Sequence, residues 1–267
     1  MHTAVLISGG LDSAVLLAEE AARSDNNFVQ PIYVSVGLAW EAAEMATVRE
    51  LLAVEPRSSR TRPLVSLTVD MRDVYAKGHW AIEGRPPSYH TADEEVYLPG
   101  RNIVLLGKAG VFCAAAGIDR IVLGTLAHNP FPDATPAFRS AMGEALSLGL
   151  AHALTIDAPF AGAGKAEVIR RGAVLGVPLR LTLSCMDPQT GRRVQGVQGV
   201  QEVRKVLGVR KVLEVRGVQR EPSEPLEPLE PLFVHCGTCS KCRERHLAFL
   251  EAGVADPTDY AVRVYTS

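Results

Sequence analysis

The sequence predicts an α/β fold, a doubly wound parallel sheet followed by a C-terminal metal-binding segment. Three observations predict it. Short, continuous apolar runs alternate with amphipathic stretches through the first 176 residues. A Gly-Gly pair separates the first apolar run from the first amphipathic stretch. Three of the five cysteines fall within seven residues near the C-terminus.

The expected elements follow one another in strict alternation. Apolar runs typical of strands buried on both faces occupy residues 3–8, 30–37, 65–69, 120–125 and 153–158. Helical periodicity occupies residues 12–23, 41–53, 102–117, 137–149 and 165–176. Between residues 76 and 99, glycines and prolines alternate with aromatic residues, which predicts a long loop or lid.

Composition narrows the class of protein. The chain has 267 residues, a formal net charge of −2, 47% hydrophobic residues and 22% charged residues, as in ordinary globular proteins. No run of eighteen apolar residues predicts a membrane span, and no charged region or cleavage site predicts an export signal. The charge is not basic, so nucleic-acid binding is not predicted. Together with the cysteine cluster, these observations predict a cytoplasmic protein with one bound metal.

Residues 192–231 break the pattern. Valine recurs nine times at a period of three between residues 194 and 218, and Glu-Pro triplets follow from Glu221. A period of three fits neither a helix face nor a strand face, so this segment predicts a mobile, low-complexity insert. A short basic helix is the alternative, since residues 192–220 hold eight Lys or Arg. The expected organisation is a catalytic domain at 1–186, an insert at 187–232 and a metal-binding segment at 233–267.

A candidate phosphate-binding loop follows the first expected strand. Ile7 and the run Ser8-Gly9-Gly10-Leu11-Asp12-Ser13 place two glycines, two hydroxyls and a helix N-terminus together, which together form a cradle for phosphate. Asp12 either caps the helix or holds a Mg²⁺ ion that accompanies the phosphates. No Gly-Lys-Ser/Thr follows, so the loop is not a Walker A motif.

The cysteine cluster predicts a metal site. Cys236, Cys239 and Cys242 repeat a Cys-x-x-Cys spacing, and Cys185 is the best candidate for a fourth ligand, at the end of an expected strand. His235 is the second candidate for that ligand. Four thiolates would form a closed, structural Zn²⁺ site, and an iron–sulfur cluster remains the alternative. Cys113 lies in an apolar helix and is expected in the core.

The loop at residues 8–13 resembles the signature of the PP-loop ATP pyrophosphatases, which have a Rossmann-like fold. Together with the four cysteines, it resembles the 7-cyano-7-deazaguanine synthase family of queuosine biosynthesis. Three further stretches are similar to motifs of that family: Tyr97-Leu-Pro-Gly-Arg-Asn102, Lys165-Ala-Glu-Val-Ile169 and Leu175-Gly-Val-Pro178 before Leu183-Ser-Cys185.

The resemblance implies an ATP-dependent carbon–nitrogen ligase that uses Mg²⁺. It would convert 7-carboxy-7-deazaguanine and ammonia to 7-cyano-7-deazaguanine, and it suggests a homodimer. The implied ATP-binding residues are Ile7 to Ser13, and the implied catalytic residues are Asp12, Ser13, Arg101, Asp133 and Lys165. Arg101 and Lys165 also suit anions by their charge, although each could instead form a surface contact.

Two stretches depart from the family pattern. Residues 36–41 lack its Tyr-Gly-Gln-x-His run, and the substrate loop at 128–136 keeps Pro132, Asp133 and Pro136 but has Phe131, Ala134 and Thr135 at other characteristic positions. Two alternatives therefore remain. One is a related enzyme that activates a different carboxylate or a nucleobase. The other is a non-enzymatic, zinc-stabilised nucleotide-binding protein.

Overall fold

A five-stranded parallel sheet organises the chain. The computed structural model describes residues 1–54, 60–191 and 231–263. The strands lie in the order β3-β2-β1-β4-β5, all parallel. Their bounds are β1 His2–Leu6, β2 Phe28–Ser35, β3 Val65–Thr68, β4 Arg120–Val122 and β5 Thr155–Asp157. The order reverses between β1 and β4, and ligands of such sheets bind beyond the carboxyl ends of strands at this point.

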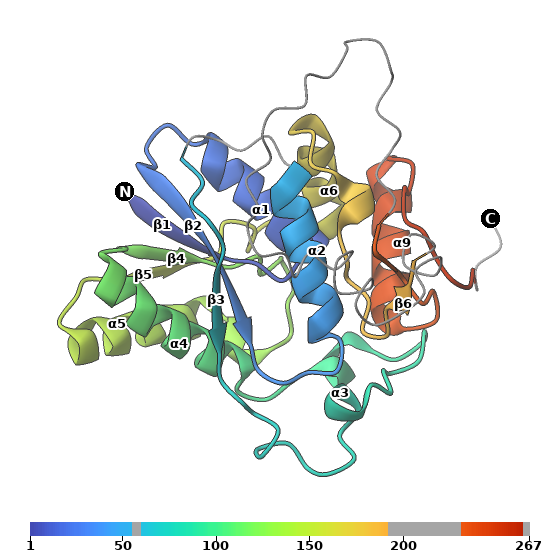
Figure 1. The fold of residues 1–267 in the computed structure, drawn as a ribbon, viewed down its shortest axis with the longest axis horizontal. Helices are drawn as coiled ribbons and strands as arrows, with labels where there is room; N and C mark the ends of the chain where they lie inside the picture. The colour runs from blue at the N-terminus through green and yellow to red at the C-terminus, as the bar shows by residue number, and fades with distance from the viewer. Residues whose placement is uncertain (55–59, 192–230, 264–267) are drawn as a thin grey trace, which may run out of the picture.

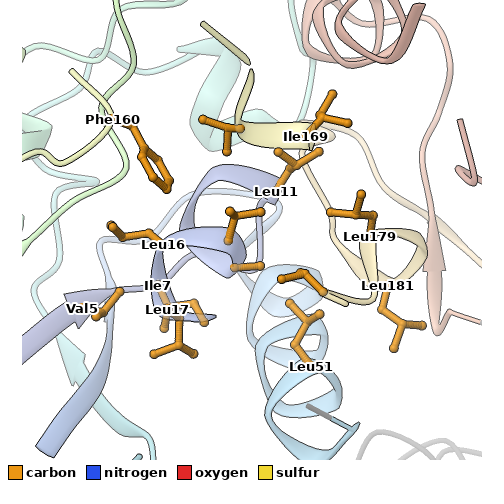
Figure 2. Packing of buried hydrophobic residues seen from close by; sticks show 14 of the residues in the cluster. Val5, Ile7, Leu11, Leu16, Leu17, Leu51, Phe160, Ile169, Leu179 and Leu181 are labelled. Carbon is orange, nitrogen blue, oxygen red and sulfur yellow. The ribbon is translucent and has the colours of Figure 1, made fainter. Parts of the chain in front are cut away.

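Helices cover both faces of the sheet (Figure 1). Helices α1 (Leu11–Ala22), α2 (Glu41–Val54) and α6 (Lys165–Val174) lie on one face, and α4 (Arg101–Ala116) and α5 (Pro136–Leu150) lie on the other. Figure 2 shows the first core, in which Leu16 and Leu17 of α1 meet Leu51, Phe160 and Ile169. Helix α1 is buried along most of its length because it packs on β1 and β2 of the sheet and is covered by α6.

The predicted α/β class and all ten predicted elements are confirmed, with boundaries shifted by up to three residues. The predicted long loop holds two short helical turns, α3 (Trp80–Glu83) and η1 (Asp93–Val96). The prediction of a strand that ends at Cys185 is wrong. The structure has a 3-10 turn, η3 (Leu179–Leu181), followed by an irregular stretch that includes Cys185. Pro178 and the tight hydrogen bonds after it favour a turn over an extended run.

The C-terminal segment adds a helix that the sequence analysis did not predict. Helix α9 (Ser240–Ala252) begins inside the cysteine cluster and packs along α6. Its sequence has weak amphipathicity because both the core and the functional site contact it, so charged residues occur on its buried side. Among the described residues, no helix combines the length and apolar character that a bilayer crossing requires.

The predicted insert at 192–231 lies outside the described residues apart from Pro231, but its two ends are described. Strand β6 (Gln189–Thr190) pairs antiparallel with β7 (Phe233–Val234), and the Gly191 N–H donates to the Leu232 carbonyl at 2.8 Å. The chain therefore leaves and re-enters the described structure at neighbouring points.

Candidate functional site

The Ser8–Ser13 loop turns sharply between β1 and α1. Gly9 has a φ of +78°, and a Cβ there would lie 3.2 Å from the Glu44 carbonyl oxygen and 3.1 Å from Thr47 Cγ2. Only glycine fits both requirements without strain. The Ser13 hydroxyl donates to the Gly10 carbonyl at 3.0 Å and accepts from the Ser8 N–H at 3.2 Å. The loop is therefore shaped before any ligand arrives.

A chain of charged side chains extends from this loop. Lys165 Nζ, at the start of α6, lies 3.2 Å from Asp12 Oδ2 and 2.5 Å from Glu244 Oε1. Glu244 Oε2 in turn lies 2.6 Å from Lys241 Nζ, which is 3.9 Å from Asp93 Oδ1. Burial opposes ionisation of Glu244, but Lys165 and Lys241 outweigh it and lower its pKa to about 2. Burial would also lower the pKa of Lys165, yet the two carboxylates raise it, so Lys165 is a permanent cation.

Arg101 and Asp133 both lie near the start of α4, where they line the same pocket. Asp133 is 4% exposed, and its Oδ2 accepts the Asn102 backbone N–H at 3.1 Å while Asn102 Nδ2 donates to Oδ1 at 3.3 Å. Burial raises the pKa of Asp133 despite these bonds. Its carboxylate thus joins the loop at residues 128–136 to α4. Arg101 Nε is buried and has no hydrogen-bond partner among the described residues.

Glu44 of α2 is a buried acid that faces the same region. Its Oε2 accepts from the Tyr33 hydroxyl at 2.9 Å, and its Oε1 accepts from Trp40 Nε1 at 3.1 Å. Burial raises the pKa of Glu44 to about 7, and the Arg101 cation acts in the opposite direction. The sequence analysis missed this residue, although the four-residue spacing of Trp40 and Glu44 on one helix face is a signal that could have found it.

A cavity in two lobes, of about 300 and 350 Å³, unites these residues. Both lobes are lined by Ser8, Gly10, Asp12, Glu44 and Arg101. The first lobe extends over the ends of β1, β2 and β4 to Ser13 and Asp133. The second extends to Lys165, Lys241 and Cys185, with Trp40 and Trp80 in its wall. The cavity lies beyond the carboxyl ends of the strands, at the point where the strand order reverses.

Four buried cysteines gather beside the second lobe. The sulfur atoms of Cys185, Cys236, Cys239 and Cys242 all lie within 4.8 Å of one another. The Sγ–Sγ distances are 4.0 Å between Cys185 and Cys239, 3.8 Å between Cys236 and Cys242, and 3.5 Å between Cys239 and Cys242. A tetrahedral Zn²⁺ site with Zn–S bonds of about 2.3 Å separates its sulfurs by about 3.8 Å. The four thiols thus have the spacing that one metal ion requires, and Cys185 is the fourth member, as predicted.

Backbone N–H groups surround these sulfurs. Cys185 Sγ accepts from Cys236 N at 3.2 Å and from Asp187 N at 3.3 Å, and Cys242 Sγ accepts from Gly237 N at 3.3 Å. Such donors stabilise thiolates. His235, the second candidate, is not part of the cluster. Burial and the Arg245 cation lower its pKa, and its neutral ring accepts the Ser184 N–H at 3.1 Å.

The cysteine cluster and the loop are directly connected. The Leu183 N–H, two residues before Cys185, donates to the Gly9 carbonyl at 2.8 Å. On the other side, Lys241 lies between Cys239 and Cys242, and Glu244 follows two residues later. The sequence analysis missed both of these side chains. Their spacing of three residues with opposite charge was a signal for a helical ion pair, had a helix been expected there.

The structure brings most predicted site residues to one cavity. Its lining includes Ile7, Ser8, Gly10, Asp12, Ser13, Arg101, Asp133 and Lys165. Gly9 and Leu11 do not line it. Leu11 is fully buried in the core, so its side chain serves packing, and Gly9 serves the turn. The functional roles of all these residues stay predictions.

The fold and this cavity define an α/β protein with a glycine-turned loop at the carboxyl edge of its sheet and a buried four-cysteine centre. The family model described as "Queuosine biosynthesis protein QueC" matches residues 2–197. The chain therefore belongs to this family of enzymes.

Individual relatives align along nearly the whole chain. The 7-cyano-7-deazaguanine synthase of Anaeromyxobacter dehalogenans (strain 2CP-C) is 29% identical over 266 residues, covering 96% of this chain and 94% of the relative. The synthase of the same name from Methanopyrus kandleri is 30% identical over 271 residues, covering 97% and 98%. Among solved structures, the U34-tRNA thiolase NcsA from Methanococcus maripaludis with its [4Fe-4S] cluster aligns with a TM-score of 0.40 and 14% identity, over 66% of this chain and 57% of that chain.

Proposed function

We propose that the protein converts 7-carboxy-7-deazaguanine and ammonia to 7-cyano-7-deazaguanine at the expense of ATP. The observation that carries this proposal is that the phosphate-binding loop, Lys165 and the cysteine cluster all border one cavity. Relatives that align with nearly the whole chain carry this name, which supports the substrate class.

The loop from Ile7 to Ser13 is the proposed ATP site. Its N–H groups and the start of α1 would bind the phosphates, and Lys165 would offset their charge. Asp12 Oδ1 is buried without a hydrogen-bond partner among the described residues, so it fits a Mg²⁺ ion. When bound, Mg²⁺ would polarise a phosphoryl oxygen and neutralise the leaving pyrophosphate.

Two adenylations complete the proposed reaction. The substrate carboxylate attacks the α-phosphorus of ATP and displaces pyrophosphate, and ammonia then displaces AMP to give the amide. The amide oxygen attacks a second ATP, and loss of AMP and two protons from the adenylated amide leaves the nitrile. Lys165 and Arg101 are placed to stabilise the charge that develops on phosphate oxygens.

The remaining predicted residues support these steps. The Ser13 hydroxyl shapes the loop through its bonds to Ser8 and Gly10. Asp133 holds the start of α4 through Asn102, so it would orient Arg101, which is the neighbour of Asn102. We assign Asp133 a positioning role, because its carboxylate is already occupied by these donors.

The cysteine cluster is the proposed site of a structural Zn²⁺ ion. Four soft thiolates at tetrahedral spacing fit Zn²⁺ and leave no open position for substrate. The ion would join the stretch around Cys185, which contacts the loop, to helix α9. We also propose that residues 1–186 form the catalytic unit with residues 233–267 bound to it, that the protein acts in the cytoplasm and that it forms a homodimer.

Incubation with 7-carboxy-7-deazaguanine, ammonium, ATP and Mg²⁺ tests the function. Mass spectrometry should detect the nitrile, with AMP and pyrophosphate formed twice for each nitrile. Asp12→Asn should abolish turnover, whereas Asp73→Asn, a change at an exposed aspartate, should not. ATP consumption with another carboxylate but not with this one would reject the substrate. Binding of ATP without any turnover would favour a sensor, and iron with acid-labile sulfide would reject zinc.

A further inference from the structure

Lys241 occupies an unusual position for a charged side chain. It lies between two cysteines of the cluster, in the first turn of α9, and its side chain lines the second lobe of the cavity. The flanking sulfurs of Cys239 and Cys242 are 3.5 Å apart and buried. A metal bound there would fix the backbone on both sides of Lys241. The Cα of this lysine would then move less than that of a lysine on an unconstrained helix end.

Glu244 holds the ammonium group of Lys241 in place. One oxygen of Glu244 binds Lys241 at 2.6 Å, and the other binds Lys165 at 2.5 Å. The two ammonium groups are therefore one carboxylate apart and line the same lobe. Each ammonium has three donors, and the described hydrogen bonds use two of those on Lys165 and one of those on Lys241.

The two lysines differ in their relation to the loop. Lys165 contacts Asp12 in the loop, so a triphosphate bound there meets Lys165 first. Lys241 is farther from the Ser8–Ser13 loop, because Glu244 separates it from Lys165. Its Nζ lies 3.9 Å from Oδ1 of Asp93, which belongs to the long loop that borders the lobe. Formation of an acyl-adenylate requires the attacking carboxylate to lie within about 3.5 Å of the α-phosphorus. The ammonium groups of Lys165 and Lys241, separated by the one carboxylate of Glu244, are therefore suited to hold the triphosphate and the substrate carboxylate close together.

The lobe around Lys241 also fits a flat heteroaromatic ring. Trp40 and Trp80 stack with their ring centroids 5.7 Å apart and their planes 8° from parallel, and both line this lobe. A lobe of about 350 Å³ is within the range that holds a small ligand. An aromatic acid requires an aromatic surface and a cation in the same lobe, and Trp40, Trp80 and Lys241 supply both.

We propose that Lys241 binds the ionised carboxylate of the aromatic acid substrate, with Glu244 as the residue that positions it. This assignment rests on the proposed function and adds a specificity-determining residue to it. In this proposal Lys165 binds the phosphates of ATP, and Lys241 binds the carboxylate of the acid. The cysteine centre thus shapes the substrate site as well as the fold, because it fixes the helix turn from which Lys241 extends.

Steady-state kinetics with varied acid and varied ATP test this division. Lys241→Met should raise the KM for the acid by about 10- to 100-fold, the loss expected for one charge-assisted hydrogen bond, and should change the KM for ATP less than about twofold. Lys241→Arg keeps the charge and should recover most of the affinity for the acid. Lys108→Met, a change at an exposed lysine of α4, is the matched control. Equal metal content in all variants verifies that the cysteine centre is intact.

Glu244→Gln provides the second test, because it removes the carboxylate that both lysines share. It should raise the KM for the acid and the KM for ATP together. An unchanged KM for the acid in Lys241→Met, or a rise confined to ATP, overturns the assignment. If the wild-type protein neither binds nor converts the acid, the proposed function fails instead, so the two failures are distinguishable.

Discussion

Arg245 offers a sharp test of how the C-terminal helix is held. Its side chain is fully buried, and it donates to Thr258 Oγ1 at 2.7 Å, to Thr182 Oγ1 at 2.8 Å and to the Leu179 carbonyl at 2.8 Å. None of these acceptors is a carboxylate. The cation therefore joins α9 to the stretch that leads to Cys185 through neutral groups alone.

We expect Arg245→Met to lower the free energy of unfolding by about 2–4 kcal/mol. Methionine fills much of the same space, so the main loss is these three bonds together with a longer one from Arg245 Nη1 to Ser184 Oγ at 3.4 Å. The Leu179 carbonyl still accepts from the Thr182 hydroxyl at 2.7 Å, which keeps the loss below the sum of three bonds to a charged group. Metal affinity should also fall, on the order of tenfold, because a buried positive charge beside the thiolates is removed.

Urea unfolding followed by circular dichroism measures the first quantity, and competition with a chelator measures the second. Lys108→Met is the control for loss of a positive charge elsewhere. A variant whose unfolding free energy lies within about 0.5 kcal/mol of the wild type would refute the reasoning. So would a variant that loses stability but binds metal as tightly as before, since the positive charge would then not stabilise the thiolates.

Two further predictions concern the acid of α2 and the insert. Burial raises the pKa of Glu44 from 4.5 to about 7, so the native protein binds a proton there that the unfolded chain has released. Its contribution to stability is therefore present below about pH 4.5 and lost as the pH rises through about 7, and Glu44→Gln should flatten that part of the curve measured by urea unfolding from pH 4 to 8. Replacing residues 192–230 with a turn of about four residues should preserve metal content and activity, because the Gly191 N–H already meets the Leu232 carbonyl. Loss of metal or precipitation of the shortened chain would show that the segment is part of the fold.

Local patterns in the sequence sufficed to predict much of this protein. The apolar run before Gly9 could only be a buried strand, and the Gly-Gly pair could only be a sharp turn, so the loop and its place in the sheet followed. The cysteine spacing predicted three members of the cluster, and Cys185 was chosen as the fourth over His235. The structure places the Cys185 sulfur, and not the His235 ring, in that cluster, and its role as a metal ligand stays a prediction.

Other residues could not be found in this way. Lys241, Glu244 and Arg245 were assigned no role from the sequence, because no helix was predicted over residues 240–252. They acquire their surroundings only because α9 packs against α6 and returns to the start of α1. Glu44 likewise reads as the polar side of a helix until Tyr33 and Trp40 enclose it.

The sequence by itself thus determined the layers, the loop and the cluster of Cys236, Cys239 and Cys242, because each depends on residues a few positions apart. Only the tertiary structure decided which charges face one another. Lys165, for example, has its carboxylate partners Glu244 and Asp12 more than 70 residues away in the sequence. The electrostatic free energy of a charged side chain depends on its distance from other charges and on its burial. The spacing of residues in the sequence determines neither quantity.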